Sequence, residues 1–168
     1  AESNSKTVDI VVEHELRGVT PEMIDWWWLH SAENYKLWHP KDHVSITREF
    51  IPNEKGGAPI RISHVVEAIG EFPATEILLR GDDTRGYPIP TVYGNSRAST
   101  WLMSDKKTPF GWLLHDYKTA PYGTKVRSTF RFPAKTPERF LKAMRQHNIE
   151  EMGQFTKFLP ELYKKSNK

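Results

Sequence analysis

The sequence contains no cysteine among its 168 residues. This absence excludes disulfides, thiolate metal ligands and cysteine nucleophiles, so any metal site must use His, Asp or Glu. It also means that cysteine usage says nothing about the redox compartment.

Several sequence patterns are also missing. The chain has no apolar run long enough to span a membrane and no signal-peptide pattern. It has no Gly-rich phosphate loop, nucleophile elbow or HExxH motif, so kinase, dehydrogenase and serine-hydrolase functions lose their support. We expect a cytoplasmic protein without a membrane partner. A first residue of Ala leaves a secreted or periplasmic protein after signal cleavage as the alternative.

The charges of the chain nearly cancel and are interspersed. There are 24 basic and 21 acidic residues, a formal net charge of +3, and no basic block. A polyanion partner is not needed to explain this balance, so we predict that the protein does not bind nucleic acid. The length fits one domain with a real core, which we expect to span residues 1–168.

Short segments rich in β-branched and aromatic residues alternate with turn residues and predict a mainly antiparallel sheet. The predicted strands cover residues 7–16, 44–51, 60–69, 74–81, 92–104, 110–119 and 123–132. Residues 1–5 are small and polar, and we expect them to be disordered.

Two helix starts pair a threonine N-cap with proline at the first helical position. The first follows Thr20 and leads into the apolar and aromatic residues 24–29. The second follows Thr136 and opens a long helix with one apolar face. We therefore predict an α+β fold, in which a curved antiparallel sheet of about seven strands grips a long C-terminal helix and leaves a pocket between them.

The most informative motif lies inside the long helix, where His147 and Glu151 are four residues apart. At this spacing an imidazole and a carboxylate project from one helix face and can bind one cation. Their face is otherwise apolar, and buried charges are costly unless they pair or bind a metal. An ordinary surface pair at the same spacing carries about equal weight.

Two histidines, His39 and His43, lie just before the second predicted strand. Functional side chains concentrate at such boundaries between elements, which makes both histidines candidates. Two histidines in a loop are nevertheless more often part of a solvated turn than of a ligand set.

Glu67 lies in the middle of an apolar strand, on the same face as Val65 and Ile69. If that face is the inner one, Glu67 is a buried carboxylate that needs a cation. If it is the outer one, Glu67 is a solvated strand residue, and alternation alone does not decide between them. Glu71 is a weaker candidate because it begins a turn.

Other candidates lie within or beside the predicted strands. His115 lies within a predicted strand, and Tyr122 immediately precedes the last one. A core histidine and a turn tyrosine are the commoner roles for residues in such places. The tryptophans at 26–28, with Trp38, are able to line a pocket for a planar ligand, although aromatic clusters are usually core.

These segments, in this order, resemble the 2,4-diacetylphloroglucinol hydrolases and the related phloretin hydrolase. The resemblance covers roughly residues 20–165 and rests on Trp26-Trp27-Trp28, Tyr35 to His43, Val66 to Gly70, His147 to Glu151, and Phe158 to Tyr163. It implies a Bet v 1-like helix-grip domain that holds zinc through two histidines and two glutamates. The implied reaction is hydrolysis of the carbon–carbon bond between an acyl group and a phloroglucinol ring.

The resemblance also implies particular site residues. The implied zinc ligands are His43, Glu67, His147 and Glu151. The implied catalytic residues are Tyr35, His115 and Tyr122. On this hypothesis the two tyrosines hydrogen-bond the phenolic oxygens, and His115 moves a proton to or from water or the ring.

Some family properties do not carry over. An asparagine that follows the family's first zinc histidine is replaced here by Ile46, so recognition of the same ring hydroxyls is not implied. The family's N-terminal region, linked to dimerisation, has no counterpart, which leaves the oligomeric state open. A set of two histidines and two glutamates also suits iron or manganese.

We therefore expect a zinc-dependent hydrolase whose partner is a small acylated phenol or polyketide. One alternative is a metal-free helix-grip protein that binds or cyclises an apolar or polyketide-like ligand in the same cavity. Another is a zinc-binding relative that acts on a different acylated phenol or a β-diketone. The four-ligand set distinguishes the enzyme from a carrier, because a carrier has no need of it.

Overall fold

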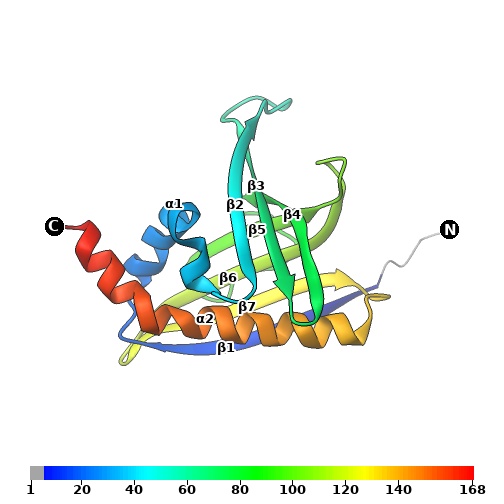
Figure 1. Cartoon of the computed structure of the whole chain (residues 1–168). Coiled ribbons are helices and arrows are strands. Elements are labelled where there is room, and N and C mark those ends of the chain that lie inside the picture. The colour runs from blue at the N-terminus through cyan, green and yellow to red at the C-terminus, as the bar shows by residue number, and fades with distance from the viewer. Residues whose placement is uncertain (1–5) are drawn as a thin grey trace.

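The computed structural model describes residues 6–168, so the expectation for residues 1–5 lies outside the described part. Seven strands and two helices make up the fold (Figure 1). In chain order they are β1 (Thr7–Arg17), α1 (Pro21–Trp38), β2 (His43–Ile51), β3 (Ile60–Ile69), β4 (Phe72–Asp82), β5 (Asn95–Leu102), β6 (Pro109–Ala120), β7 (Gly123–Pro133) and α2 (Glu138–Ser166).

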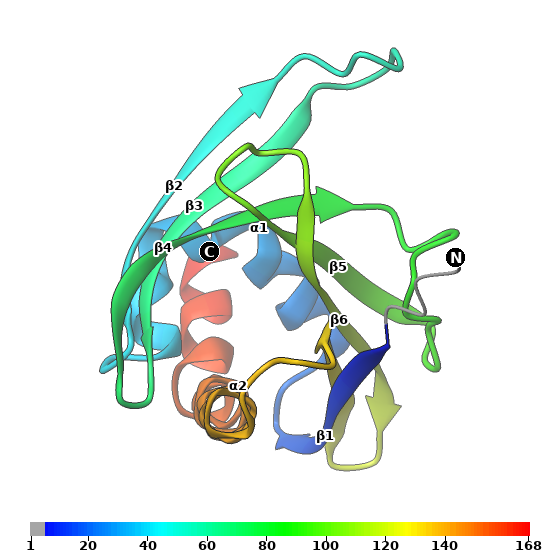
Figure 2. The same cartoon turned by 90° about the vertical axis from the view of Figure 1, so that its right-hand side faces the viewer.

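All seven strands form one antiparallel sheet in the order β1-β7-β6-β5-β4-β3-β2. From β2 to β7, strands that follow one another along the chain lie side by side in the sheet, whereas β1 joins the far edge next to β7. Viewed along α2, the sheet curves around both helices (Figure 2). The predicted α+β helix-grip arrangement is therefore confirmed.

The first helix is longer than the sequence pattern predicted. It continues past residue 29 to Trp38, although the backbone leaves helical geometry at Asn34, with φ −127° and ψ 18°. Residues such as Ser31 and Asn34 have low helix propensity, so the sequence pattern did not predict that the helix continues through them. Burial of Tyr35 and Trp38 on the inner face compensates for it.

Two other boundaries differ from the prediction. The N-cap position of α2 is Pro137, without a side-chain cap, while the N–H of Thr136 donates to the carbonyl of Pro133. Strand β5 begins three residues later than predicted. The N–H groups of Val92 and Tyr93 donate to Asp116 Oδ2, at 2.6 and 2.7 Å, instead of extending the strand.

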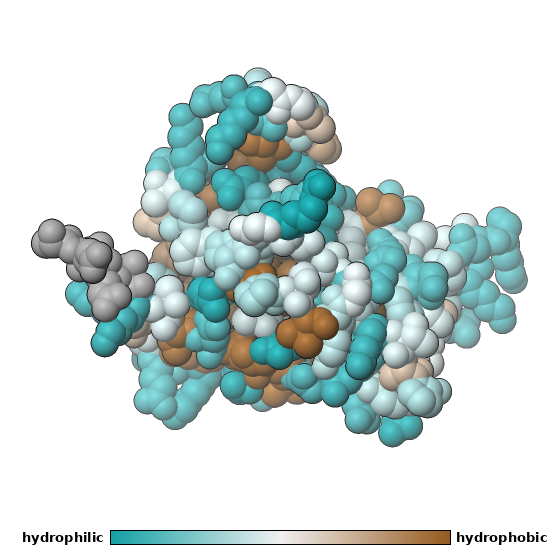
Figure 3. Space-filling view, turned by 180° about the vertical axis from the view of Figure 1, so that it is seen from behind, coloured by the Kyte–Doolittle hydropathy of each residue, from teal (hydrophilic) through white to brown (hydrophobic). Residues whose placement is uncertain are grey.

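The core fills the space between the concave face of the sheet and the two helices. Aromatic rings are prominent in it, and Trp27, Phe130, Phe132 and Phe155 are essentially inaccessible to solvent. The tryptophan cluster is thus partly core, as expected, while Trp28 lines an internal pocket. Seen from behind, the surface is largely hydrophilic, with hydrophobic atoms gathered toward its lower part (Figure 3). Within residues 6–168, no helix has the length and apolar character needed to cross a membrane.

Candidate metal centre

The four predicted ligands come together in the interior, from three different elements. His43 is the first residue of β2 and lies opposite Glu67 of β3 in the strand register. His147 and Glu151 come from adjacent turns of α2, which crosses the concave face at this point. All four are buried, with exposed fractions of 2, 9, 2 and 5%. The inner-face interpretation of Glu67 is therefore correct, and His147 with Glu151 is no surface pair.

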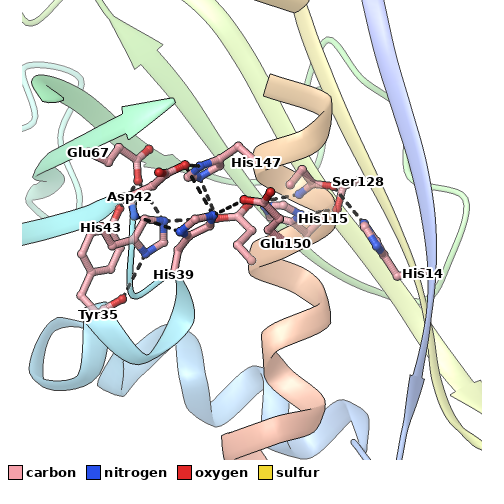
Figure 4. A network of polar contacts seen from close by, with 12 residues as sticks. His14, Tyr35, His39, Asp42, His43, Glu67, His115, Ser128, His147 and Glu150 are labelled. Carbon is pink, nitrogen blue, oxygen red and sulfur yellow. Dashed lines mark hydrogen bonds and ion pairs between the residues drawn. The ribbon is translucent and has the colours of Figure 1, made fainter. Parts of the chain in front are cut away.

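The donor atoms of this group face one another closely. His43 Nε2 lies 3.0 Å from Glu67 Oε2 and 3.4 Å from Glu151 Oε2. His147 Nε2 lies 3.3 Å from the same Glu151 oxygen. Figure 4 shows the side chains of His43, Glu67 and His147 turned toward one another between β2, β3 and α2.

The opposite nitrogens of both imidazoles are already engaged. His43 Nδ1 lies 3.0 Å from the backbone carbonyl of Tyr35, and His147 Nδ1 lies 2.9 Å from Asp42 Oδ2. Because a carbonyl oxygen only accepts, Nδ1 of His43 must donate, which leaves a lone pair on Nε2 of the neutral ring. Such second contacts are typical of metal-binding histidines, since they fix the tautomer and orient the ring.

The environment of the buried His43 Nε2 atom indicates that a cation fits the site. Despite its 3.0 Å contact with Glu67, His43 Nε2 has no hydrogen-bond partner of suitable direction among the described residues. A buried polar atom without a partner is costly. Two imidazole nitrogens and two carboxylates are also a normal donor set for a divalent metal ion. The site is therefore able to hold one.

The electrostatics of the group favour positive charge at its centre. Burial alone would lower the pKa of both histidines, but the neighbouring carboxylates outweigh it and raise the pKa of His43 to about 9 and that of His147 to about 10. Burial would likewise raise the pKa of Glu151, yet the two imidazoles hold it well below its usual range. The carboxylates thus attract either imidazole protons or a metal ion that replaces them.

A second group of buried polar residues supports the ligands from outside. Asp42 accepts from His147, and its own backbone N–H donates to His39 Nδ1 at 2.9 Å. Since Nδ1 accepts, His39 carries its proton on Nε2, which lies 2.7 Å from Glu150 Oε2. His39 is therefore a buried supporting residue and not a solvated loop histidine. The chain of contacts runs from the centre to the surface at Glu150 (Figure 4).

Asn148 supports Glu151 in a similar way from within α2. Its Nδ2 donates to Glu151 Oε1 at 3.1 Å, and its Oδ1 lies 2.9 Å from His14 Nε2 on β1. No local sequence pattern marks Asp42, Asn148 or His14 as part of the site. The only signal for the first two was their position next to candidate ligands in the chain.

An internal pocket opens from the metal centre between the sheet and α1. Tyr35, Glu67, His147 and Glu151 form its inner end, and its wall includes Trp28, Trp38 and His115. The Tyr35 hydroxyl donates to Glu67 Oε2 at 2.5 Å, and its ring stacks on His43 at 4.0 Å between centroids. Burial and the charge of Glu67 raise the pKa of Tyr35 well above its usual value, so it stays a hydrogen-bond donor.

His115 faces the pocket from β6. Its Nδ1 lies 2.8 Å from Ser128 Oγ, and its ring stacks on Trp28 at 5.5 Å. Burial lowers the pKa of His115 to about 4, so the imidazole is neutral near pH 7. A neutral imidazole can both accept and donate a proton. His115 also lines the pocket, where the resemblance led us to expect it.

Tyr122 and Glu71 do not join this site. Tyr122 belongs to the turn between β6 and β7, where the Arg17 guanidinium lies 5.5 Å from its ring centroid, and it is not part of the pocket wall. The turn directs its side chain toward the end of β1, which corrects the expectation of a second pocket tyrosine. Glu71 pairs with Arg139 at the surface, so Glu67 is the carboxylate that faces the centre.

The role of Asp42 leads to a first prediction. Asp42→Asn keeps the shape of the side chain but removes the charge that orients and polarises His147. We expect a 10- to 100-fold loss of metal affinity, the usual effect of losing such a contact. Competition with a fluorescent chelator measures it. Asp83→Asn is a matched control, because Asp83 pairs with Arg85 at the surface; equal affinity in both variants would contradict the assigned role.

Solved structures with the same fold have very different sequences. Ara h 8.0201 aligns with a TM-score of 0.58 and 14% identity, over 92% of this chain and 98% of that one. Protein NE0264 from Nitrosomonas europaea aligns with a TM-score of 0.56 and 16% identity, over 95% of this chain and 96% of that one. The di-domain ARO/CYC StfQ from the steffimycin biosynthetic pathway aligns with a TM-score of 0.58 and 11% identity, over 94% of this chain and 52% of that one. These likenesses confirm the Bet v 1-like fold alone. No curated protein sequence matches the chain.

A family model goes further than these structural likenesses. The model described as DAPG hydrolase PhiG domain matches residues 3–136, which is most of the chain. The match includes His43, Glu67 and the pocket residues of the sheet, and it ends before α2. The contribution of His147 and Glu151 therefore rests on the geometry described above. The chain belongs to the DAPG hydrolase PhiG domain family, a family of hydrolases.

Proposed function

We propose that the protein is a zinc-dependent hydrolase that cleaves the carbon–carbon bond between an acyl group and a phenolic ring. The observation that carries this proposal is the convergence of His43, Glu67, His147 and Glu151 at the inner end of an aromatic-lined pocket. Membership of the family supports the hydrolase class.

The spacing of the donor atoms is compatible with zinc. Zinc forms bonds of about 2.0–2.1 Å to imidazole nitrogen and carboxylate oxygen, so the edges of its tetrahedron are about 3.3 Å long. The contacts of 3.0, 3.3 and 3.4 Å between the facing atoms are close to that edge. Three edges of the site therefore match a zinc tetrahedron, and the donor atoms of His43, Glu67 and His147 all lie within 4.8 Å of one another.

The proposed reaction adds water across the bond between the acyl carbon and the ring. The hydroxyl joins the acyl carbon, giving a carboxylic acid, and a proton joins the ring carbon, giving the free phenol. Bound zinc would polarise the substrate carbonyl as a Lewis acid. In this proposal neutral His115 moves the proton, and Tyr35, whose hydroxyl donates to Glu67 Oε2, turns from that carboxylate to donate to a substrate oxygen. Trp28 and Trp38 keep bulk water from the ring.

A metal-free binding protein or cyclase is the alternative. The fold permits it, since the di-domain ARO/CYC StfQ shares the fold. Two buried carboxylates and two histidines at the inner end of the pocket count against it, because a carrier of apolar ligands would bury charges there for no benefit.

Turnover of acylated phenols tests the proposal. Monoacetylphloroglucinol, diacetylphloroglucinol and phloretin, followed by loss of absorbance, form a suitable panel for zinc-loaded and chelator-treated protein. We expect turnover of at least one compound, with release of the carboxylic acid, and loss of turnover after chelation. Bound zinc without turnover of any acylphenol or β-diketone would contradict the hydrolase assignment.

The variant His115→Ala separates catalysis from metal binding in the same assay. We expect a roughly 10²- to 10⁴-fold lower kcat, the usual contribution of a positioned acid or base, with zinc content unchanged. Loss of zinc would instead make His115 structural or a ligand. Ser128→Ala, which removes its partner at 2.8 Å, should lower kcat less.

A further inference from the structure

The charges of the pocket are unevenly distributed along its length. At the inner end, two carboxylates are balanced by two imidazoles or by a divalent ion. Farther along, the wall carries three arginines from three strands, namely Arg48 of β2, Arg61 of β3 and Arg97 of β5. Within the described residues, the acidic members of the wall are Glu67 and Glu151. The outer half of the pocket is thus strongly positive.

The strand register places these arginines on the concave face. Arg48 lies opposite Ser63, two residues from Arg61 on β3, and Arg97 lies opposite His115. Alternation keeps Arg61 and Glu67 on the same side of β3, six residues apart, or about 20 Å between Cα atoms. The arginines and the metal centre are therefore opposite ends of one elongated site.

Gly81 allows two of the guanidinium groups to approach each other. A Cβ atom added there would lie 3.6 Å from Arg61 Nη2 and 3.8 Å from Arg97 Nη2. Both groups therefore reach the same point of the wall, over the one residue of β4 that has no side chain. Two guanidinium groups at such a point form a natural cradle for an anion with two oxygens.

The structure provides no counterion for this cradle. Among residues 6–168, no carboxylate lies within ion-pair distance of the three arginines, whereas Arg80, on the other face of β4, pairs with Asp82 at 2.8 Å. Asp82 and Asp83 line an adjoining groove with Arg61 and Arg97, but they are engaged by Arg80 and Arg85. Burial lowers the pKa of Arg61, and the like charge of Arg48 lowers it further.

One of the three arginines also has a structural contact. Arg48 Nη2 donates to Ser31 Oγ of α1 at 2.9 Å, while its buried Nε has no partner among the described residues. Arg61 and Arg97 make no such contact with the rest of the described chain. They are therefore the cleaner residues to test.

We infer that the substrate is an anion, an acylated phenol with a carboxylate at the end remote from the scissile bond, and that Arg61 and Arg97 bind this carboxylate with the help of Arg48. This inference rests on the proposed function and narrows its substrate class. It explains why three arginines line a pocket whose other walls combine aromatic and aliphatic side chains with a few serines. A neutral acylphenol would leave the three partly buried guanidinium groups without a counterion.

Matched ligands test the inference. Glutarylphloroglucinol carries the carboxylate on the acyl chain, and 3-acetyl-2,4-dihydroxybenzoate carries it on the ring. Each is compared with its primary amide, which has the same shape without the charge. Binding is followed by quenching of tryptophan fluorescence, since Trp28 and Trp38 line the pocket, and turnover by absorbance. We expect at least one acid to bind about 10- to 100-fold more tightly than its amide, as expected for charge-assisted hydrogen bonds.

Variants assign the preference to the arginines. In Arg61→Met/Arg97→Met the preference for the acid should disappear, with the amide bound as in the wild type and the melting temperature preserved. Arg17→Met, which changes a surface arginine beside Glu15, should keep the preference. Equal binding of acid and amide by the wild type would overturn the inference, as would an undiminished preference in the double variant. Tighter binding of the acid without turnover of either compound would uphold the anion site while contradicting the proposed hydrolysis.

Discussion

Replacing His147 by Ala is expected to abolish stoichiometric metal binding. The wild type should carry about one zinc per chain after loading and desalting, and the variant less than a tenth of that. The change removes one of the four proposed ligands and also takes one partner from each of the buried carboxylates of Asp42 and Glu151. Elemental mass spectrometry of the desalted proteins measures the zinc content directly.

The same substitution should lower stability, because removing one partner of a buried ionic group typically costs about 3–5 kcal/mol. Glu67→Ala should also lose the metal, since Glu67 faces the centre from β3. His64→Ala is the matched control on that strand. His64 lies on the opposite face, beside Glu49 and Glu76 at 3.2 and 3.4 Å, so its loss should leave zinc content unchanged. Retention of one zinc per chain by His147→Ala would contradict the four-ligand site.

The sequence predicted the residues that come together at the candidate centre better than it predicted their surroundings. His147 and Glu151 are four residues apart on a helix, and Glu67 interrupts an apolar strand, so local periodicity was enough to mark them as candidates. Periodicity could not say which face of β3 points inward. That depends on the curvature of the whole sheet and on the packing of α2 against it, which are tertiary properties.

The supporting residues were beyond local reasoning. Asp42 and His39 contact residues of α2 that lie more than a hundred positions away in the chain. Each looks like an ordinary polar residue of a loop, and only the packed structure shows that both are buried. Tyr122 shows the opposite error. A tyrosine beside a strand resembles a pocket residue, yet the turn between β6 and β7 directs it toward Arg17.

The cluster of three arginines could not be predicted from the sequence either. They come from β2, β3 and β5, and nothing in their spacing along the chain connects them. Their cluster arises from strand alternation together with the gap at Gly81. The composition, with nearly balanced charges, concealed this local excess of positive charge.

Replacing Trp27 by Ala is expected to destabilise the fold by about 3–5 kcal/mol, the usual cost of removing a large aromatic side chain from a core. Trp27 is fully buried between the helices and makes edge contacts with Trp38, Phe155 and Phe158 at centroid distances of 5.8, 5.7 and 5.1 Å. For a chain of this size the melting temperature should fall by about 10 °C, which calorimetry measures.

The matched comparison lies two residues away on the same helix. Leu29 is 67% exposed, so Leu29→Ala removes no core packing and should change the free energy of unfolding by less than about 0.5 kcal/mol. Trp27→Phe should lie between the two, because the Trp27 Nε1 has no hydrogen-bond partner to lose among the described residues. A cost below about 1 kcal/mol for Trp27→Ala would mean that α1 does not depend on this contact for its position.

Since Trp38 packs against both Trp27 and His43, at 5.8 and 5.4 Å between ring centroids, a loosened contact between the helices should also weaken metal binding. On this expectation, the aromatic core positions the candidate metal centre as well as stabilising the fold.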